Sequence, residues 1–165
     1  MSEQCTWLPE LILLETFGGA WGDYVEALYA AFSKDFLVPL PKFDGRRLGL
    51  KRMPEHEGKC CTFWHFISEG AREAERTPDL RRCERIRWPR RMLDEAAAGG
   101  DRVHVWSNAR GTERRWVIAV TDFSYVLILT DRGEFLLPWT AYAVEYKNRR
   151  QQLKDECEAW VAQKG

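Results

Sequence analysis

The feature that most limits the fold is a change of hydrophobic periodicity about two thirds of the way along the chain. Between residues 21 and 36, apolar side chains recur at steps of three or four, which predicts an amphipathic helix with one buried face. Beyond residue 101, segments rich in β-branched and aromatic residues alternate with short turn-forming stretches. These strand-like segments cover residues 103–107, 115–121, 125–130 and 134–139. Helical periodicity followed by strand periodicity predicts an α+β fold.

The regions between and after these segments complete the expected arrangement. We expect a short strand within residues 43–50, a helix from about Thr62 to Gly70 and a helix over residues 92–98, after a break at Pro89. A closing helix over residues 146–163 is expected to bury four side chains, namely Leu153, Cys157, Trp160 and Val161. The prediction is one domain over residues 1–165. N-terminal helices, in about residues 1–100, pack on a C-terminal four-stranded antiparallel sheet, and the closing helix follows the sheet.

The cellular setting is predicted from segments that the sequence lacks. The longest apolar runs are far shorter than the roughly 20 residues that a membrane-spanning helix requires. The N-terminal residues do not combine a basic stretch with an apolar stretch, as a secretory signal would. We therefore expect a cytoplasmic protein that does not act on a membrane.

Residues 81–91 concentrate positive charge in a chain whose formal net charge is zero. The segment contains six arginines, one acid and a tryptophan. Guanidinium groups bind the phosphate backbone, and an indole or a guanidinium stacks on bases. This composition indicates nucleic acid as a partner. The nucleic-acid-binding residues predicted from it are Arg81, Arg82, Arg87, Trp88, Arg90 and Arg91. A solvated helix face with surface ion pairs is the alternative, because acids flank the segment.

His65 is the histidine best placed for proton transfer. It stands four residues before Glu69 in a stretch that we expect to be helical, so both side chains would share one face. A carboxylate one turn away orients an imidazole and raises its pKa, which suits a general acid or base near neutral pH. A buried histidine that a neighbour satisfies is the structural alternative.

Several kinds of chemistry lack their sequence signals. No histidine, cysteine or carboxylate pattern has the spacing of a metal site, so no metal is predicted. No glycine-rich phosphate loop and no nucleophile elbow are present, and no cofactor is predicted. The remaining groups suit metal-independent cleavage of RNA, in which the 2′-hydroxyl attacks the adjacent phosphate and cations stabilise the transition state. Thr140 and Tyr142, where the last strand ends, are candidates to contact that phosphate. The alternative, which these two residues taken alone favour, is a strand-terminal threonine and a tyrosine that packs on the last helix.

The order of these features resembles the phage and mobile-element branch of the barnase, EndoU, colicin and RelE-like ribonuclease group. The resembling parts are residues 63–67 around His65, residues 85–89 from Arg85 to a proline, the meander, and residues 140–142. The resemblance covers roughly residues 43–160. It implies a toxin or effector that cleaves RNA without a metal, with His65 as base or acid, Arg85 on the phosphate, and Thr140 and Tyr142 as site residues. One helix histidine rather than two leaves the second acid or base open.

Two functional hypotheses follow from this sequence. The first is a metal-independent endoribonuclease of toxin type, with His65, Arg85, Thr140 and Tyr142 in catalysis and Glu69 in support. The second is a non-catalytic nucleic-acid-binding or partner-binding protein of a mobile element, in which the arginines only bind. RNA is the expected partner, and an antitoxin or immunity protein is left open as a second one. Convergence of His65, Arg85 and Tyr142 on one cleft would favour catalysis, whereas their placement on separate faces would favour the binding protein.

Overall fold

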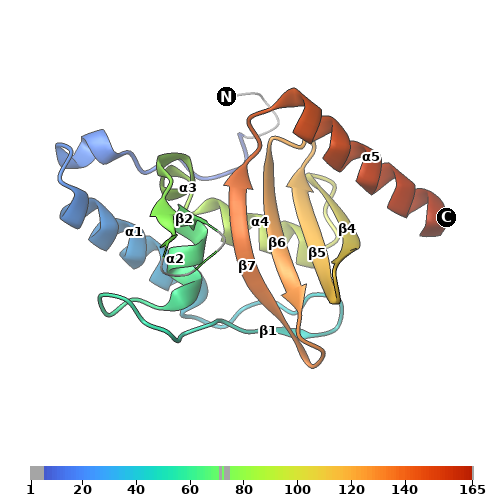
Figure 1. The fold of residues 1–165 in the computed structure, drawn as a ribbon, viewed down its shortest axis with the longest axis horizontal. Helices are drawn as coiled ribbons and strands as arrows, with labels where there is room; N and C mark the ends of the chain where they lie inside the picture. The colour runs from blue at the N-terminus through green and yellow to red at the C-terminus, as the bar shows by residue number, and fades with distance from the viewer. Residues whose placement is uncertain (1–5, 71, 73–74, 165) are drawn as a thin grey trace.

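The protein is described here by a computed structural model that covers residues 6–70, 72 and 75–164. It combines helices and a sheet, so the predicted α+β class is confirmed (Figure 1). Within these residues the elements are the 3-10 helix η2 (Leu14–Phe17), α1 (Trp21–Phe36), β1 (Arg47–Leu48), α2 (Cys61–Ile67), β2 (Ser68–Glu69), β3 (Thr77–Pro78), α3 (Leu80–Glu84), α4 (Trp88–Ala97), β4 (Val103–Arg110), β5 (Glu113–Val120), β6 (Tyr125–Asp131), β7 (Phe135–Ala143) and α5 (Lys147–Lys164).

The main sheet has the predicted antiparallel meander and one further strand. Its order is β1-β7-β6-β5-β4, and β1 runs parallel to β7, with Leu48 opposite Leu136. The prediction of a four-stranded, wholly antiparallel sheet is therefore wrong in this detail. A short strand is expected within residues 43–50, but its partner lies far along the chain, where no local pattern specifies the pairing.

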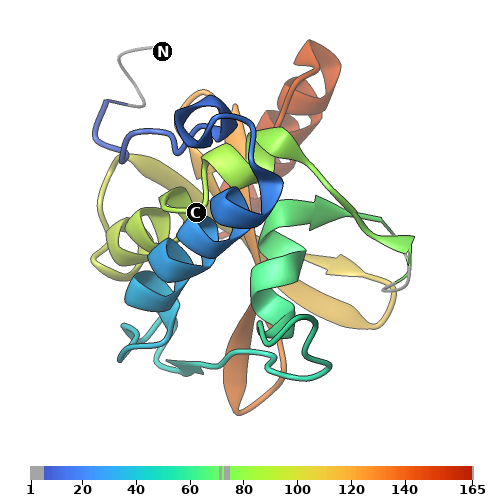
Figure 2. The same ribbon diagram turned by 90° about the vertical axis from the view of Figure 1, so that its left-hand side faces the viewer.

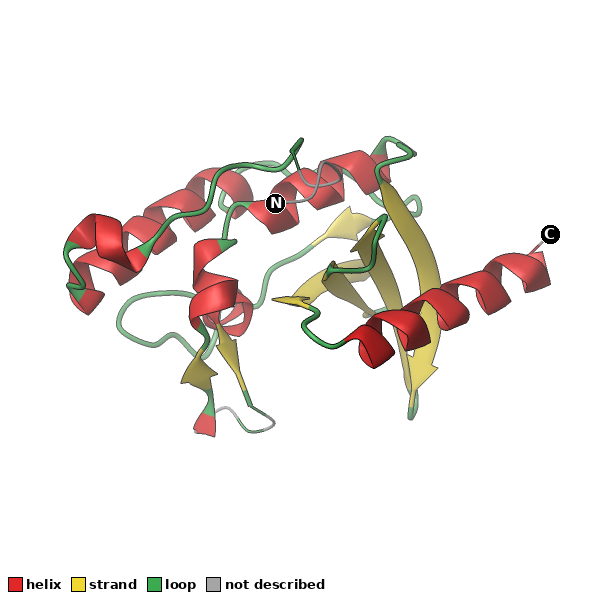
Figure 3. Ribbon diagram, turned by 90° about the horizontal axis from the view of Figure 1, so that it is seen from above, coloured by secondary structure: helices red, strands yellow, loops and turns green. Residues whose placement is uncertain are grey.

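The two faces of the sheet are covered by different helices. In Figure 3, α5 runs to the C label on one side of the sheet, and α1 and α4 lie on the other side. The larger hydrophobic core lies on the α4 side, where residues of α1, such as Phe32, pack with Phe66 of α2 and with Leu127 of β6. Figure 2 shows α1 crossing in front of this layer, beside α2 and α4. The inner strands are apolar on both faces because both faces are covered.

A smaller core lies under α5. Leu153 and Cys157 are buried there against Trp106, Val117 and other apolar residues of the sheet, as predicted. The prediction is wrong for Val161, whose surface is 53% exposed. The neighbouring Trp160 is partly buried against this core and donates its indole N–H to Oγ of Ser107 on β4 (3.1 Å). Successive residues of a helix point in different directions, so Val161 does not face the sheet as Trp160 does.

Local residue chemistry explains where the short helices begin and end. The side chain of Asp79 accepts a hydrogen bond from the Arg81 N–H (3.1 Å), which caps α3. The sequence predicts a break in helical structure at Pro89, but this residue lies in the first turn of α4. An N–H group there has no partner within the helix, so proline removes no helical hydrogen bond. The helix therefore starts at Trp88, earlier than predicted.

Among the described residues, no helix combines the length and the apolar composition that crossing a membrane requires.

Candidate nucleic-acid interface

A cleft rich in arginine lies on the α5 side of the sheet, beside the first turns of α5. Its volume is about 230 Å³. Its charged lining consists of five guanidinium groups and one carboxylate, which belong to Arg76, Arg82, Arg110, Arg115, Arg149 and Glu69. We call this site the arginine cleft. Such an excess of positive charge favours an anionic ligand, above all a phosphate, which a guanidinium binds through two parallel hydrogen bonds.

The arginine cleft collects side chains from segments that are distant in the sequence. Arg76 precedes β3, Arg82 lies on α3, and Arg149 lies on the first turn of α5. Arg110 and Arg115 come from the ends of β4 and β5 that flank their hairpin turn. In Figure 1 the labelled elements α3 and β2 lie beside β7, and α5 starts close to the end of that strand.

Arg82 is held in place by contacts with β7. Its Nη1 donates hydrogen bonds to the Ser68 carbonyl (2.9 Å) and to Oγ1 of Thr140 (2.9 Å). Its guanidinium carbon lies 5.3 Å from the centre of the Tyr142 ring. Thr140 and Tyr142 are two residues apart on the strand, so both side chains point to the same face. A guanidinium that is already ordered loses little entropy when it binds a ligand.

The wall of the cleft near β4 and β5 contains two buried polar atoms that lack a hydrogen-bond partner among the described residues. They are Nε of Arg115 and Oδ1 of Asn108. Burial, and secondly the nearby charge of Arg110, lowers the pKa of Arg115 from its ordinary value. Asn108 is oriented by the hydrogen bond from its Nδ2 to Oε2 of Glu156 (3.2 Å). A phosphate oxygen can accept from Arg115, and a ribose hydroxyl can donate to Asn108.

Trp139 reaches the cleft because β7 contains an irregularity. Ile128 pairs with Thr140 and Leu129 pairs with Pro138, which leaves Trp139 between them without a paired residue on β6. Bulges of this kind often reorient a side chain next to a functional site. The His65 ring lies 4.5 Å from the Trp139 ring, and His65 is only 3% exposed. His65 contacts Trp139 but is not among the residues that line the arginine cleft.

Glu69 lines the arginine cleft, although not in the predicted geometry. Helix α2 ends at Ile67, and the extended backbone of Ser68 leads into β2. Glu69 pairs with Thr77 on β3, so it does not share a helix face with His65. The predicted helical pairing of these two side chains is wrong, because the helix ends two residues earlier than that pairing requires.

The predicted basic segment does not form one surface, although Arg87, Arg90 and Arg91 line a separate cleft of about 380 Å³ that also contains two carboxylates. Of its six arginines, all within the described part of the chain, Arg82 lines the arginine cleft and the other five do not. Arg81 forms an ion pair with Glu145 (2.8 Å). Arg85, the predicted phosphate ligand, donates to the Arg81 carbonyl and lies over the Trp88 ring, with its guanidinium carbon 5.1 Å from the ring centre.

The remaining members of the segment make contacts with the N-terminal part of the chain. Arg87 donates to the Glu10 carbonyl (2.6 Å), and Arg91 lies over the Trp7 ring. Trp88 is 3% exposed and donates its indole N–H to the Pro9 carbonyl (2.8 Å). Arg90 donates to Asp94 and to a carbonyl of α1. These contacts give Trp88 and the three arginines structural roles, and the buried indole is not available to stack on a base.

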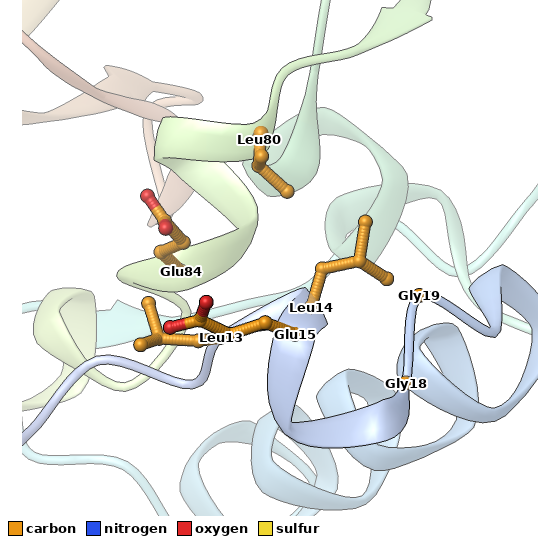
Figure 4. A pocket seen from close by; sticks show the side chains of 7 residues that line it. All are labelled: Leu13, Leu14, Glu15, Gly18, Gly19, Leu80 and Glu84. Atoms are coloured by element: carbon orange, nitrogen blue, oxygen red, sulfur yellow. The ribbon is translucent and has the colours of Figure 1, made fainter.

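A larger cleft, of about 530 Å³, lies on another part of the surface, between η2 and α3 (Figure 4). It is lined by Leu13, Leu14, Glu15, Gly18, Gly19, Leu80 and Glu84. Its charged lining residues are both carboxylates, which repel a phosphate backbone. Among the described residues, no three histidines, cysteines or carboxylates cluster as metal ligands would. The arginine cleft is therefore the better candidate for binding nucleic acid.

Sequence reasoning missed Arg76, Arg110, Arg115 and Arg149, as well as Asn108 and Trp139. For the strand residues a signal was present, because Asn108 and Arg110 are two residues apart on β4 and Asn108 pairs with Arg115 on β5, so all three share one face. Polar side chains on one face at the end of a hairpin indicate that the face is open there.

Comparison of the chain with models of protein families, with curated proteins and with solved structures gives no match.

Proposed function

We propose that the protein is a metal-independent endoribonuclease of toxin or effector type whose active site is the arginine cleft. The observation that carries this proposal is the contact of Arg82 with Thr140 and Tyr142 inside a cleft that contains four further arginines. Thr140 and Tyr142, the two residues expected at the end of the sheet, both contact this guanidinium group. His65 and Arg85 do not line the cleft, so the expected convergence of His65, Arg85 and Tyr142 is not found, and the proposal depends on the arginines, Thr140 and Tyr142 instead. RNA is the substrate of this activity, which we place in the cytoplasm.

The proposed reaction transfers the phosphate from one ribose oxygen to another. The 2′-oxygen attacks phosphorus while its proton passes to a base, and the bond to the 5′-oxygen breaks as an acid protonates that oxygen. The products are a 2′,3′-cyclic phosphate and a free 5′-hydroxyl. Within the described lining, Glu69 is the carboxylate and Tyr142 the phenol, which fit the roles of base and acid. The arginines bind the phosphate oxygens, where negative charge increases in the transition state.

His65 takes a different role from the one expected from sequence. Its ring packs against Trp139 and is nearly buried, so we assign it as a positioning residue for that indole. Lys51 and Arg132 also lie over Trp139, each 5.5 Å from the ring centre, and add positive charge beside the cleft. Arg85 supports Trp88 rather than the substrate in this proposal.

The test is cleavage of a defined RNA oligonucleotide in the presence of EDTA. The expected result is a 2′,3′-cyclic phosphate product, and a loss of at least ~100-fold in rate for both Glu69→Gln and Tyr142→Phe. A single 2′-deoxy substitution at the cleavage site should abolish cleavage without abolishing binding. RNA that binds in the cleft but stays intact would favour the alternative, a non-catalytic nucleic-acid-binding protein. Absence of both binding and cleavage would refute both functions.

A further inference from the structure

A second cleft adjoins the arginine cleft. Its volume is about 490 Å³, and its lining includes Glu55, His56, Trp64, Ser68, Arg76 and Pro78. The β2–β3 pair separates the two clefts, because Ser68 and its partner Pro78 face the second cleft whereas Glu69 and Gly70 line the arginine cleft. Arg76 lines both. The two clefts are therefore neighbours on either side of the β2–β3 pair, and the Arg76 side chain contributes to both.

The wall between the clefts is fixed by hydrogen bonds. Nε of Arg76 donates to Oγ of Ser68 (3.0 Å), and its two terminal nitrogens donate to the carbonyls of Gly70 (2.9 Å) and Ser68 (2.6 Å). The guanidinium plane is thereby held in one orientation. Planar guanidinium groups stack on nucleobases and attract phosphate, so Arg76 suits a position between a base and its phosphate.

The opposite part of the second cleft is aromatic. The rings of His56 and Trp64 meet edge to face, with centres 5.2 Å apart and planes at 68°. The indole N–H of Trp64 donates to the His56 carbonyl (3.0 Å), which satisfies its polar atom and fixes the ring. The His56 side chain is 71% exposed. The fixed indole and the exposed imidazole beside it provide stacking surfaces for an unpaired base.

We propose that this second cleft, which we call the base cleft, binds the nucleobase adjacent to the phosphate held in the arginine cleft. The inference rests on the proposed function, because that function places the RNA phosphate in the neighbouring arginine cleft. A base can enter the cleft only when it is unstacked and unpaired, so the substrate class is single-stranded RNA. Glu55 at the rim provides a carboxylate that accepts hydrogen bonds from base amino groups.

The experiment uses NMR spectroscopy of the full chain labelled with ¹⁵N and follows the indole N–H signals of Trp64 and Trp139. Each signal is assigned by its disappearance in the corresponding variant, Trp64→Phe or Trp139→Phe. The probes are the four nucleoside 3′-monophosphates and inorganic phosphate. We expect the nucleotides to shift both signals, whereas phosphate alone shifts the Trp139 signal. Because stacking on an aromatic side chain contributes measurably to binding, His56→Ala should weaken nucleotide binding at least about fivefold, and His56→Phe should retain it. Phosphate affinity should not change in either variant.

The outcomes separate this inference from the proposed function. Nucleotides that shift the Trp139 signal but leave the Trp64 signal in place would overturn the base cleft and leave the ribonuclease proposal standing. A Trp64 shift that depends on the ring at position 56, in a protein without cleavage activity, would support the base cleft and refute catalysis. Equal affinity of His56→Ala and the unaltered protein would also overturn the base cleft.

Discussion

Residues 81–91 and the arginine cleft contain similar numbers of arginines and use them in opposite ways. The six arginines of the segment are adjacent in sequence, yet five of them contact carbonyls, carboxylates or aromatic rings outside the cleft. The five arginines of the cleft come from separate elements and surround one space. Arg82 belongs to both groups. Charge density along the sequence is therefore a poor guide to charge density in space.

The geometry of helices accounts for this difference. Successive residues of α3 and α4 point in different directions around each axis, so adjacent arginines reach different neighbours. Arg81 and Arg82 illustrate this, since the side chain of Arg81 is 56% exposed beside Glu145 and that of Arg82 is 12% exposed beside Thr140. Strand pairing has the opposite effect, because it brings Arg110 and Arg115 from the two sides of a hairpin to one edge of the cleft.

The largest expected effect is the contrast between Arg82→Ala and its neighbour Arg81→Ala. Arg82→Ala should reduce kcat/KM for RNA cleavage at least ~100-fold, as loss of a group that stabilises transition-state charge typically does. Arg81→Ala should change little, because exposed ion pairs contribute little. Initial rates with a fluorescent RNA in EDTA measure both variants, and thermal unfolding checks their folds. Arg82→Lys distinguishes the charge from the planar guanidinium. Equal effects at the two positions would refute the comparison.

Arg90→Ala should affect stability rather than activity. Its guanidinium donates to Asp94 (2.9 Å) and to the Asp35 carbonyl (2.7 Å), so its loss should cost about 1–2 kcal/mol of the free energy of unfolding. Urea denaturation measures this cost, and the cleavage rate of the folded variant should match that of the unaltered protein. A loss of cleavage without a loss of stability would show that the basic segment contacts RNA.

The same variant has a predicted pH dependence. Burial raises the pKa of Asp35 from its ordinary value of 3.8, and the charge of Arg90 acts in the opposite direction. Because the pKa of Asp35 is higher in the folded state than its ordinary value of 3.8, the protonated carboxyl stabilises the folded state at pH values below 3.8. This stabilisation is lost as the pH rises through the folded-state pKa. Arg90 offsets the cost of the ionised carboxyl at neutral pH. Arg90→Ala should therefore destabilise the protein more at neutral pH than below the ordinary pKa of Asp35.

The smallest expected effect is a change in the salt dependence of binding. Arg110→Ala removes one cleft guanidinium, so the slope of log Kd against log salt concentration should fall by about one unit with a non-cleavable oligonucleotide. Arg91→Ala, from the basic segment, should leave the slope unchanged because Arg91 lies over Trp7. Fluorescence anisotropy between about 50 and 200 mM salt measures both slopes. A reduced slope for Arg91→Ala alone would reverse the assignment of the two regions.

The elements of this fold could be predicted where one sequence pattern decides them. The apolar steps of residues 21–36 match α1, and the four strand-like segments match β4 to β7, because helix and strand periodicities are local properties. Patterns failed where a short element depends on a partner outside its own segment. The parallel strand β1 pairs with β7, far along the chain, and α2 ends at Ile67, where the next two residues pair with β3.

The candidate site divides in the same way. Residue types and positions alone pointed to Arg82, Thr140 and Tyr142, because a basic segment and the end of a strand can be recognised in the sequence. The sequence did not predict that His65 packs on Trp139 outside the cleft, that Arg85 lies away from the cleft, or that four further arginines meet there, namely Arg76, Arg110, Arg115 and Arg149. Those outcomes depend on strand register, on the irregularity in β7 and on helix packing, each of which fixes side-chain direction through contacts between residues far apart in the chain.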